Sequence, residues 1–212
     1  MAKKKIAFLF DKKNDWIFYL FNKYPIKHDN FIIKSFFERK KITNFDIVFL
    51  LGYTKKVSNN FLNKNNLTLV VHESDLPNGR GFSPIQWQLL EGKSEITISL
   101  IEVTEDIDGG DIFLQSKMRF NGTELYEEIR DKQAKATRKI IKTFLNKFPK
   151  LNKKKQFGKG SIYPKRKPQN SQLNIKKSIE ENFNLLRIGN NDSWPSFFIH
   201  KGIKYILKIY KG

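Results

Sequence analysis

The sequence contains no cysteine and only three histidines among its 212 residues. The absence of cysteine excludes a disulfide framework and any metal site built on thiolates. The three histidines, His28, His72 and His200, lie far apart in the chain, so a zinc site built on histidine is not expected either. We therefore predict that the protein binds no metal.

Long apolar runs are also missing. The first residues are basic, as in a secretion signal, but the apolar run at 6–10 ends at Asp11 and is too short for one. No other stretch approaches the roughly 20 apolar residues that a membrane-spanning helix needs. These absences predict a soluble, cytoplasmic protein with no membrane contact.

Acidic residues are scarce relative to basic ones, with 21 Asp and Glu against 40 Lys and Arg, a net charge of +19. Such an excess can attract nucleic acids or anionic substrates. Because lysines occur along the whole chain, the sequence favours basic residues spread over the solvated surface, and nucleic acid is not an expected partner. One local excess of basic residues remains, at 151–167.

Apolar runs of strand length alternate with helical patterns along the first 150 residues. Strands are predicted at 5–10, 45–51, 67–71 and 96–103, and helices at 16–22, 58–64, 84–91 and 123–148. This alternation predicts an α/β fold with a Rossmann-like, mostly parallel sheet. Ligands bind at the carboxyl ends of the strands in such sheets, so we expect Gly52, His72 and the loop after Val103 to lie together there.

The last 60 or so residues have a different character. Residues 151–174 are rich in Lys, Pro, Gln and Asn, which is typical of a linker. A helix is predicted at 177–187, and a hairpin with a glycine-containing turn at 196–209. The predicted organisation is a main domain at 1–150, followed by a basic linker and a small helix-plus-hairpin extension at 151–212.

Two polar stretches follow predicted strands and contain the residues best suited to chemistry. Residues 72–87 read HESDLPNGRGFSPIQW and place an imidazole at the end of a buried strand. Residues 104–112 read TEDIDGGDI, a carboxylate-rich loop with paired glycines at 109 and 110. A histidine that faces such a loop makes an acid–base pair, although an isolated histidine is more often structural.

These stretches resemble the signature of the folate-dependent formyltransferases, the family of methionyl-tRNA, glycinamide ribonucleotide and nucleotide-sugar formyltransferases. The family pattern is Asn-x-His, Ser-x-Leu-Pro, Arg-Gly, Pro-Ile-Gln and, after a further strand, Leu-Asp-x-Gly-Asp. The resemblance spans roughly residues 46–148, and the chain supplies matching residues at His72, Ser74, Leu76, Pro77, Arg80, Gly81, Pro84, Ile85, Gln86, Ile107, Asp108, Gly110 and Asp111.

The resemblance implies an enzyme that moves a formyl group from 10-formyltetrahydrofolate, its co-substrate, to an amine. It assigns His72 and Asp108 as the catalytic pair: the histidine would donate to the formyl oxygen, while the aspartate orients it and helps collect the proton of the amine. It also implies a folate pocket made of two loops, which contribute Leu51, Gly52, Tyr53 and Thr54 on one side and Asp106 and Ile107 on the other.

One departure from the family pattern concerns Val70. Family members usually have an asparagine two residues before the histidine, whose amide helps stabilise the oxyanion, and loss of such a donor costs about 2.7–4 kcal/mol. Either another group donates, with Glu73 and Ser74 as candidates, or the protein is slow or inactive. A folate-binding homologue with weak catalysis therefore stays an alternative.

The acceptor follows from finer comparison within the family. The residues after the long helix are too few for the extra domain of methionyl-tRNA enzymes. The turn FDKKNDW at 10–16 has no glycine, unlike the phosphate loop of glycinamide ribonucleotide enzymes. Residues 161–174 and 184–198 resemble the segment that follows the core of nucleotide-sugar formyltransferases.

We therefore predict an N-formyltransferase that acts on a nucleotide-linked amino deoxysugar for surface glycans such as lipopolysaccharide. Phosphoribosylglycinamide formyltransferase is the alternative, and a homodimer is left open. Substrate contacts are predicted at Arg80, Tyr163, Lys165, Arg166 and Arg187, where the basic groups would meet the phosphates or base of the nucleotide.

Overall fold

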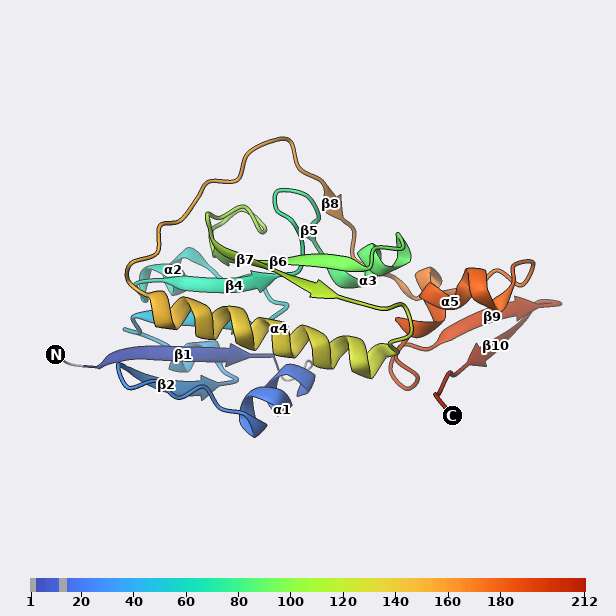
Figure 1. Ribbon diagram of the computed structural model, residues 1–212, viewed down its shortest axis with the longest axis horizontal. Coiled ribbons are helices and arrows are strands. Elements are labelled where there is room, and N and C mark those ends of the chain that lie inside the picture. Colours follow the sequence, from blue (N-terminus) through green and yellow to red (C-terminus); the bar gives the residue numbers. More distant parts are fainter. Residues whose placement is uncertain (1–2, 12–14) are drawn as a thin grey trace.

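A six-stranded sheet with strand order β2-β1-β3-β4-β6-β7 forms the centre of the protein (Figure 1). The structure is a computed structural model, which describes residues 3–11 and 15–212. The strands β2, β1, β3 and β4 are parallel, which confirms the predicted mostly parallel α/β sheet. The six strands are β1 (Lys4–Phe10), β2 (Phe31–Phe36), β3 (Ile47–Leu51), β4 (Thr68–His72), β6 (Glu95–Glu102) and β7 (Ile112–Arg119).

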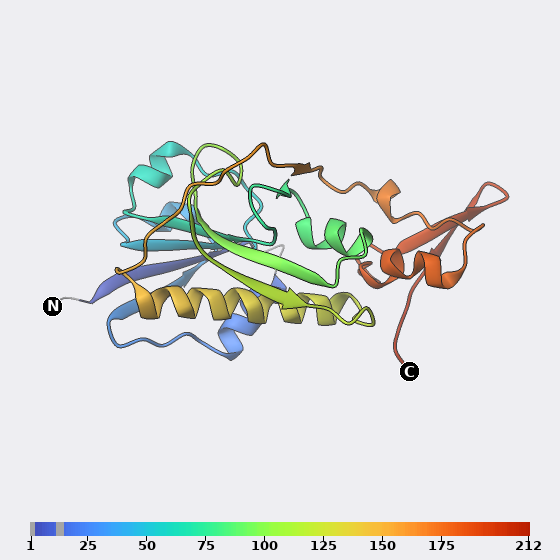
Figure 2. The same ribbon diagram turned by 45° about the horizontal axis from the view of Figure 1, so that its top comes forward.

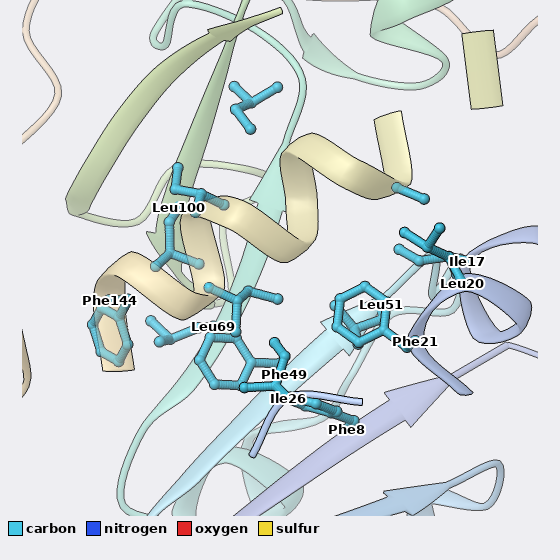
Figure 3. Close-up of a cluster of buried hydrophobic side chains, with 14 of the residues drawn as sticks. Phe8, Ile17, Leu20, Phe21, Ile26, Phe49, Leu51, Leu69, Leu100 and Phe144 are labelled. Carbon is cyan, nitrogen blue, oxygen red and sulfur yellow. The ribbon is translucent and has the colours of Figure 1, made fainter. Parts of the chain in front are cut away.

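Helices cover both faces of this sheet. The helices α1 (Asp15–Lys23) and α4 (Tyr126–Lys147) lie on one face, and α2 (Asn59–Asn63) lies on the other (Figure 2). Strand β3 has all five residues buried, because both of its faces are covered. The main core lies between the sheet and α4, where Phe49 packs edge-on against Phe8 and Phe144, with ring centroids 5.6 and 5.9 Å away (Figure 3).

Strand β6 runs antiparallel to β4, with Leu69 opposite Glu102 and His72 opposite Ser99. The loop after Val103 therefore leaves the sheet at the end opposite to His72, and the prediction that both lie at carboxyl ends on one edge is wrong. This loop instead folds back towards His72. Strand β7, which the sequence analysis did not identify, pairs antiparallel with β6 at the edge of the sheet. Its apolar run stops after three residues, Ile112–Leu114, and all but one of its residues are partly or fully exposed, so it resembles neither a buried strand nor a regular alternation.

The shorter elements of the main domain are η1 (Arg39–Lys41), β5 (Arg80–Gly81) and α3 (Pro84–Leu90). After α4 the chain turns back across the main domain (Figure 2). Residues 151–163, predicted as part of a linker, are held in place: Ile112 and Lys154 exchange main-chain hydrogen bonds of 2.7 and 2.8 Å, and β8 (Ile162–Tyr163) pairs with β5. We call residues 151–163 the strap.

The extension beyond the strap contains η2 (Pro168–Ser171), α5 (Ile179–Arg187), and a hairpin of β9 (Ser196–His200) and β10 (Ile203–Leu207). It forms a small lobe beside the start of α4 (Figure 1). A buried ion pair between Arg187 and Glu124, with Nη1 and Oε2 3.4 Å apart, joins this lobe to the main domain. Among the residues described, no helix is long and apolar enough to cross a membrane.

Candidate active site

A cleft of about 410 Å³ opens around the carboxyl ends of β3 and β4. One wall comes from residues 50–57, following β3, and from the loop at 103–108. The opposite wall comes from α1 and α4 on the other face of the sheet, through residues that include Trp16, Arg130 and Thr137. His72, the last residue of β4, also lines the cleft; we call the part beside residues 50–57 and 103–108 the first lobe and the part beside α1 and α4 the second lobe.

The structure brings together the two residues predicted to be catalytic. The His72 ring is buried, with Nδ1 3.5 Å from Oδ2 of Asp108 and Nε2 2.8 Å from the carbonyl oxygen of Gly79. Both ring nitrogens thus face oxygen acceptors, and both can donate only when the ring is a cation. A cationic imidazole can donate to an oxygen on which negative charge develops, and Asp108 balances its charge.

The loop that carries Asp108 is held by contacts distant in sequence. Oδ2 of Asp108 accepts a 2.9 Å hydrogen bond from the N–H of Gly81. The amide of Gln156, in the strap, donates to the carbonyl oxygens of Asp108 and Gly110 at 2.8 Å each. Gly110 packs so closely that a Cβ there would lie 1.8 Å from the carbonyl oxygen of Glu102. The loop therefore takes its shape from the strap and from this close approach.

The predicted folate residues all line the first lobe. They are Leu51, Gly52, Tyr53, Thr54, Asp106 and Ile107. The Thr54 hydroxyl donates to Oδ2 of Asp11 at 2.8 Å, which ties the loop after β3 to the end of β1. Gly52 has a positive φ of 58°, a conformation that suits glycine and lets the chain turn sharply after β3. Apolar side chains such as Leu50 and Val57 complete this lobe.

Val70 lies where the family pattern has asparagine, and its partly buried side chain lines the cleft. The position therefore faces the site but supplies an apolar surface. Of the two replacement donors considered from the sequence, Ser74 is 1% exposed and is absent from the described lining of the cleft. Glu73 does line the cleft.

The second lobe is polar and joins Glu73 to α4. The Glu73 carboxylate accepts a hydrogen bond from the side-chain amide of Gln133, whose oxygen accepts from Nη1 of Arg130 at 2.7 Å. Burial raises the pKa of Glu73, although the charges of His72 and Arg130 and the Gln133 amide act in the opposite direction. The Arg130 guanidinium also lies over the ring of Trp16, 4.9 Å from its centroid.

The five predicted substrate contacts do not reach the cleft, and none belongs to its described lining. Arg80 donates to Oε1 of Gln156 at 2.6 and 3.1 Å, and so supports the amide that holds the Asp108 loop. The Tyr163 hydroxyl donates to Glu91 at 2.8 Å, and burial together with this contact raises the pKa of Tyr163.

The remaining three lie beyond the strap. Lys165 is exposed, Arg166 donates to Asn170 and Ser171, and Arg187 is buried against Glu124. Packing thus gives the two arginines internal partners in place of a phosphate, whereas the phosphate contact predicted for the exposed Lys165 stays a prediction.

Sequence reasoning missed Gln156, Arg130 and Gln133, and considered Glu73 only as a possible oxyanion donor. Arg130 and Gln133 are three residues apart on α4 and so share a helix face, a spacing visible in the sequence. Gln156 has no such signal, because it reaches Asp108 across 48 residues of chain. Among the residues described, no group of three or more His, Asp or Glu could hold a metal ion.

Comparison with known proteins agrees with this geometry. The formyl transferase family matches residues 7–145. The methionyl-tRNA formyltransferase of Mycoplasmopsis pulmonis is 34% identical over 131 residues, which are 61% of this chain and 45% of that protein. The chain spans about half the length of the curated relatives it matches.

Solved structures share the fold. A methionyl-tRNA formyltransferase from Clostridium thermocellum superposes with a TM-score of 0.78 at 20% identity, over 95% of this chain and 90% of that one. A 4-N formyltransferase from Francisella tularensis superposes with a TM-score of 0.74 at 17% identity, over 97% of both chains. Because the family match covers more than half of the chain, this protein belongs to the formyl transferase family.

Proposed function

We propose that the protein transfers a formyl group from 10-formyltetrahydrofolate to the amine of a nucleotide-linked amino deoxysugar. The observation that carries the proposal is the His72–Asp108 pair between two lobes of unlike chemistry, one largely apolar and one polar. An imidazole at such a junction can stabilise the negative charge that forms on the formyl oxygen when an amine attacks the formyl carbon.

The first lobe fits the folate. A flat pteridine needs an apolar slot with main-chain groups along its edge, and Leu50, Val57 and Ile101 supply apolar walls beside the loop at 51–54. The glutamyl tail of folate is anionic, and Lys55 and Lys56 line the same end of the cleft. Chain residues would thus hold both ends of the co-substrate, whose formyl group supplies the one-carbon unit.

The amino sugar is supported by the second lobe and by one structural likeness. Glu73, Gln133 and Thr137 offer the mixture of acceptors and donors that a small, hydroxylated amine requires. The Francisella 4-N formyltransferase and this chain overlap over 97% of both, so the strap and extension have counterparts in that protein. Formylation of such a sugar would serve surface glycan biosynthesis.

Methionyl-tRNA is the second candidate acceptor. The curated relatives reported above act on it by name, and the net charge of +19 suits an RNA ligand, whose binding would weaken with salt. The amine of the methionyl ester would enter the same polar lobe.

The test is to incubate the protein with 10-formyltetrahydrofolate and each acceptor in turn, and to detect the added formyl group by mass spectrometry. The panel contains thymidine-diphosphate-linked 3-amino and 4-amino deoxyhexoses, methionyl-tRNA and glycinamide ribonucleotide. We expect formylation of an amino deoxysugar only. Formylation of methionyl-tRNA alone would establish the second candidate, and the absence of any product together with no binding of 5-formyltetrahydrofolate would refute both.

A further inference from the structure

The polar lobe contains buried groups that have no partner within the protein. The side chain of Thr137 is 2% exposed and its hydroxyl makes no hydrogen bond with any residue that the structure describes. The indole N–H of Trp16 and the Nε–H of Arg130 are buried and equally unpaired within those residues. Buried polar atoms are nearly always hydrogen-bonded in native proteins, so three unpaired ones in residues of a single cleft wall favour a ligand that brings polar groups to this wall.

The Glu73 carboxylate faces the same lobe and can accept more hydrogen bonds than it receives. A carboxylate can accept about four hydrogen bonds, and its side-chain partner in the described structure is the amide of Gln133 alone. Arg130 is close enough to influence the charge of Glu73, yet the two make no ion pair within 4 Å. The charged or titratable neighbours of the carboxylate are thus His72 on its own strand and Arg130 on α4.

We propose that Glu73 is the residue that binds the attacking amine of the acceptor and removes its proton. The inference rests on the proposed formyl transfer and names the acceptor side of that reaction. Glu73 adjoins His72 in the chain, both line the cleft, and the two are near enough for the charge of His72 to act on the pKa of Glu73. The resemblance to the family does not supply this role, since its pattern assigns no acidic residue between the histidine and Ser74.

The chemistry requires such a group because an amine attacks only when neutral. An alkyl amine like that of lysine, with a pKa of about 10.4, is protonated near neutral pH. His72 is poorly placed to take this proton, because both of its ring nitrogens already face oxygen atoms of Gly79 and Asp108. A carboxylate whose pKa burial has raised is a stronger base than a solvated one.

The step balances as follows for an acceptor R–NH3⁺. Glu73 takes one proton, and the neutral nitrogen bonds to the formyl carbon. The bond between that carbon and N10 of the folate then breaks, and its electron pair stays on N10. A second proton leaves the former amine and passes to N10, which carried none before. The products are R–NH–CHO and tetrahydrofolate, and the proton on Glu73 passes to solvent.

The unpaired donors specify what surrounds the amine. The Trp16 and Arg130 N–H groups can only donate, whereas the Thr137 hydroxyl can donate and accept. They suit hydroxyl or ring oxygens close to the amine, so the ligand class is an amino polyol. A plain alkyl amine would leave these three groups unpaired and should be a poor acceptor.

The experiment compares wild type with Glu73→Gln, Glu73→Asp and the control Glu127→Gln, an exposed position on α4. Turnover of a thymidine-diphosphate-linked 4-amino-4,6-dideoxyhexose is measured from about pH 6 to about pH 9, and 5-formyltetrahydrofolate affinity by calorimetry. Glu73→Gln should lower kcat at least ~10²-fold at neutral pH, with a rate that rises about tenfold per pH unit as free amine accumulates. Folate affinity should stay within a factor of about two.

The carboxylate in Glu73→Asp should restore part of the rate and the wild-type pH profile. If Glu73→Gln has the wild-type rate, or a rate lowered by the same factor at every pH, the inference is overturned. The proposed formyl transfer is not affected by that result. If wild type binds 5-formyltetrahydrofolate but formylates no sugar, the 4-amino sugar is compared with its 4-hydroxy counterpart by calorimetry. Equal affinities then overturn the inference, and a preference for the amine that Glu73→Gln abolishes supports it. No folate binding at all refutes the proposed function instead.

Discussion

Replacing Asp108 with asparagine changes one charge beside the imidazole and almost no volume. Oδ2 of Asp108 lies 3.5 Å from Nδ1 of His72 and accepts a hydrogen bond of 2.9 Å from the N–H of Gly81. The oxygen of an asparagine can keep the bond from Gly81, and the Gln156 bonds to this loop use main-chain oxygens. The variant should therefore keep the loop in place and lose only the charge.

The size of the effect follows from that distance. Two unit charges 3.5 Å apart attract by about 5 kcal/mol at an effective dielectric constant of 20. The side chains are only 7% and 16% exposed, so water screens this attraction little. Relaxation of the site makes the figure an upper bound, and about 3–4 kcal/mol corresponds to a 10²- to 10³-fold fall in kcat. Folate binding, which uses the first lobe, should change little.

The assay measures kcat by the formyl mass added to the acceptor, beside the melting temperature and the affinity for 5-formyltetrahydrofolate. Asp192→Asn is the matched control, because Asp192 is 88% exposed and pairs only with Lys208 at the surface. A folded Asp108→Asn protein with kcat within about fivefold of wild type would refute the reasoning. So would a loss of rate fully explained by weaker folate binding.

Two further predictions concern contacts made across the chain. Gln156→Ala removes two hydrogen bonds to the Asp108 loop, which are worth about 1 kcal/mol each. We expect kcat to fall about tenfold or more and the melting temperature to fall slightly. An unchanged kcat would contradict the role of the strap. Arg187→Met breaks the buried pair with Glu124 and should cost about 2–4 kcal/mol in urea unfolding at neutral pH, at the low end because Lys132 still pairs with Glu124. Burial opposes ionisation of Glu124, but the Lys132 hydrogen bond and main-chain N–H groups outweigh it and lower its pKa to about 2. Stabilisation by the Glu124 carboxylate is thus present above about pH 4.5 and lost as the pH falls towards 2, so the difference between wild type and Arg187→Met should shrink there; a constant difference would contradict it.

The elements of the fold could be predicted because their signals are local. Strand β1 shows as the apolar run at 5–10, and α4 shows as the helical pattern predicted at 123–148. His72 and Asp108 could also be identified as candidates, since each belongs to a short contiguous stretch, at 72–87 and 104–112. Burial periodicity and motif spacing require no knowledge of distant residues.

Which distant segments meet was decided only by the tertiary structure. The direction of β6 depends on its pairing with β4, and that pairing places the end of β6 away from His72. The Asp108 loop reaches the imidazole because Gln156 and Gly81 hold it, and the amide of Gln156 comes from the basic strap.

Arg187 shows the same limit of sequence reasoning for a charged residue. Its cation appears free to bind phosphate until folding buries it beside Glu124, which lies 63 residues earlier in the chain. Glu73 is the opposite case, since folding buries it in a cleft wall with few partners. The sequence by itself determined which chemical groups are present and which stretches form strands and helices. Their partners, and with them their charge states and roles, were decided by long-range packing, because hydrogen bonds and desolvation depend on neighbours in space.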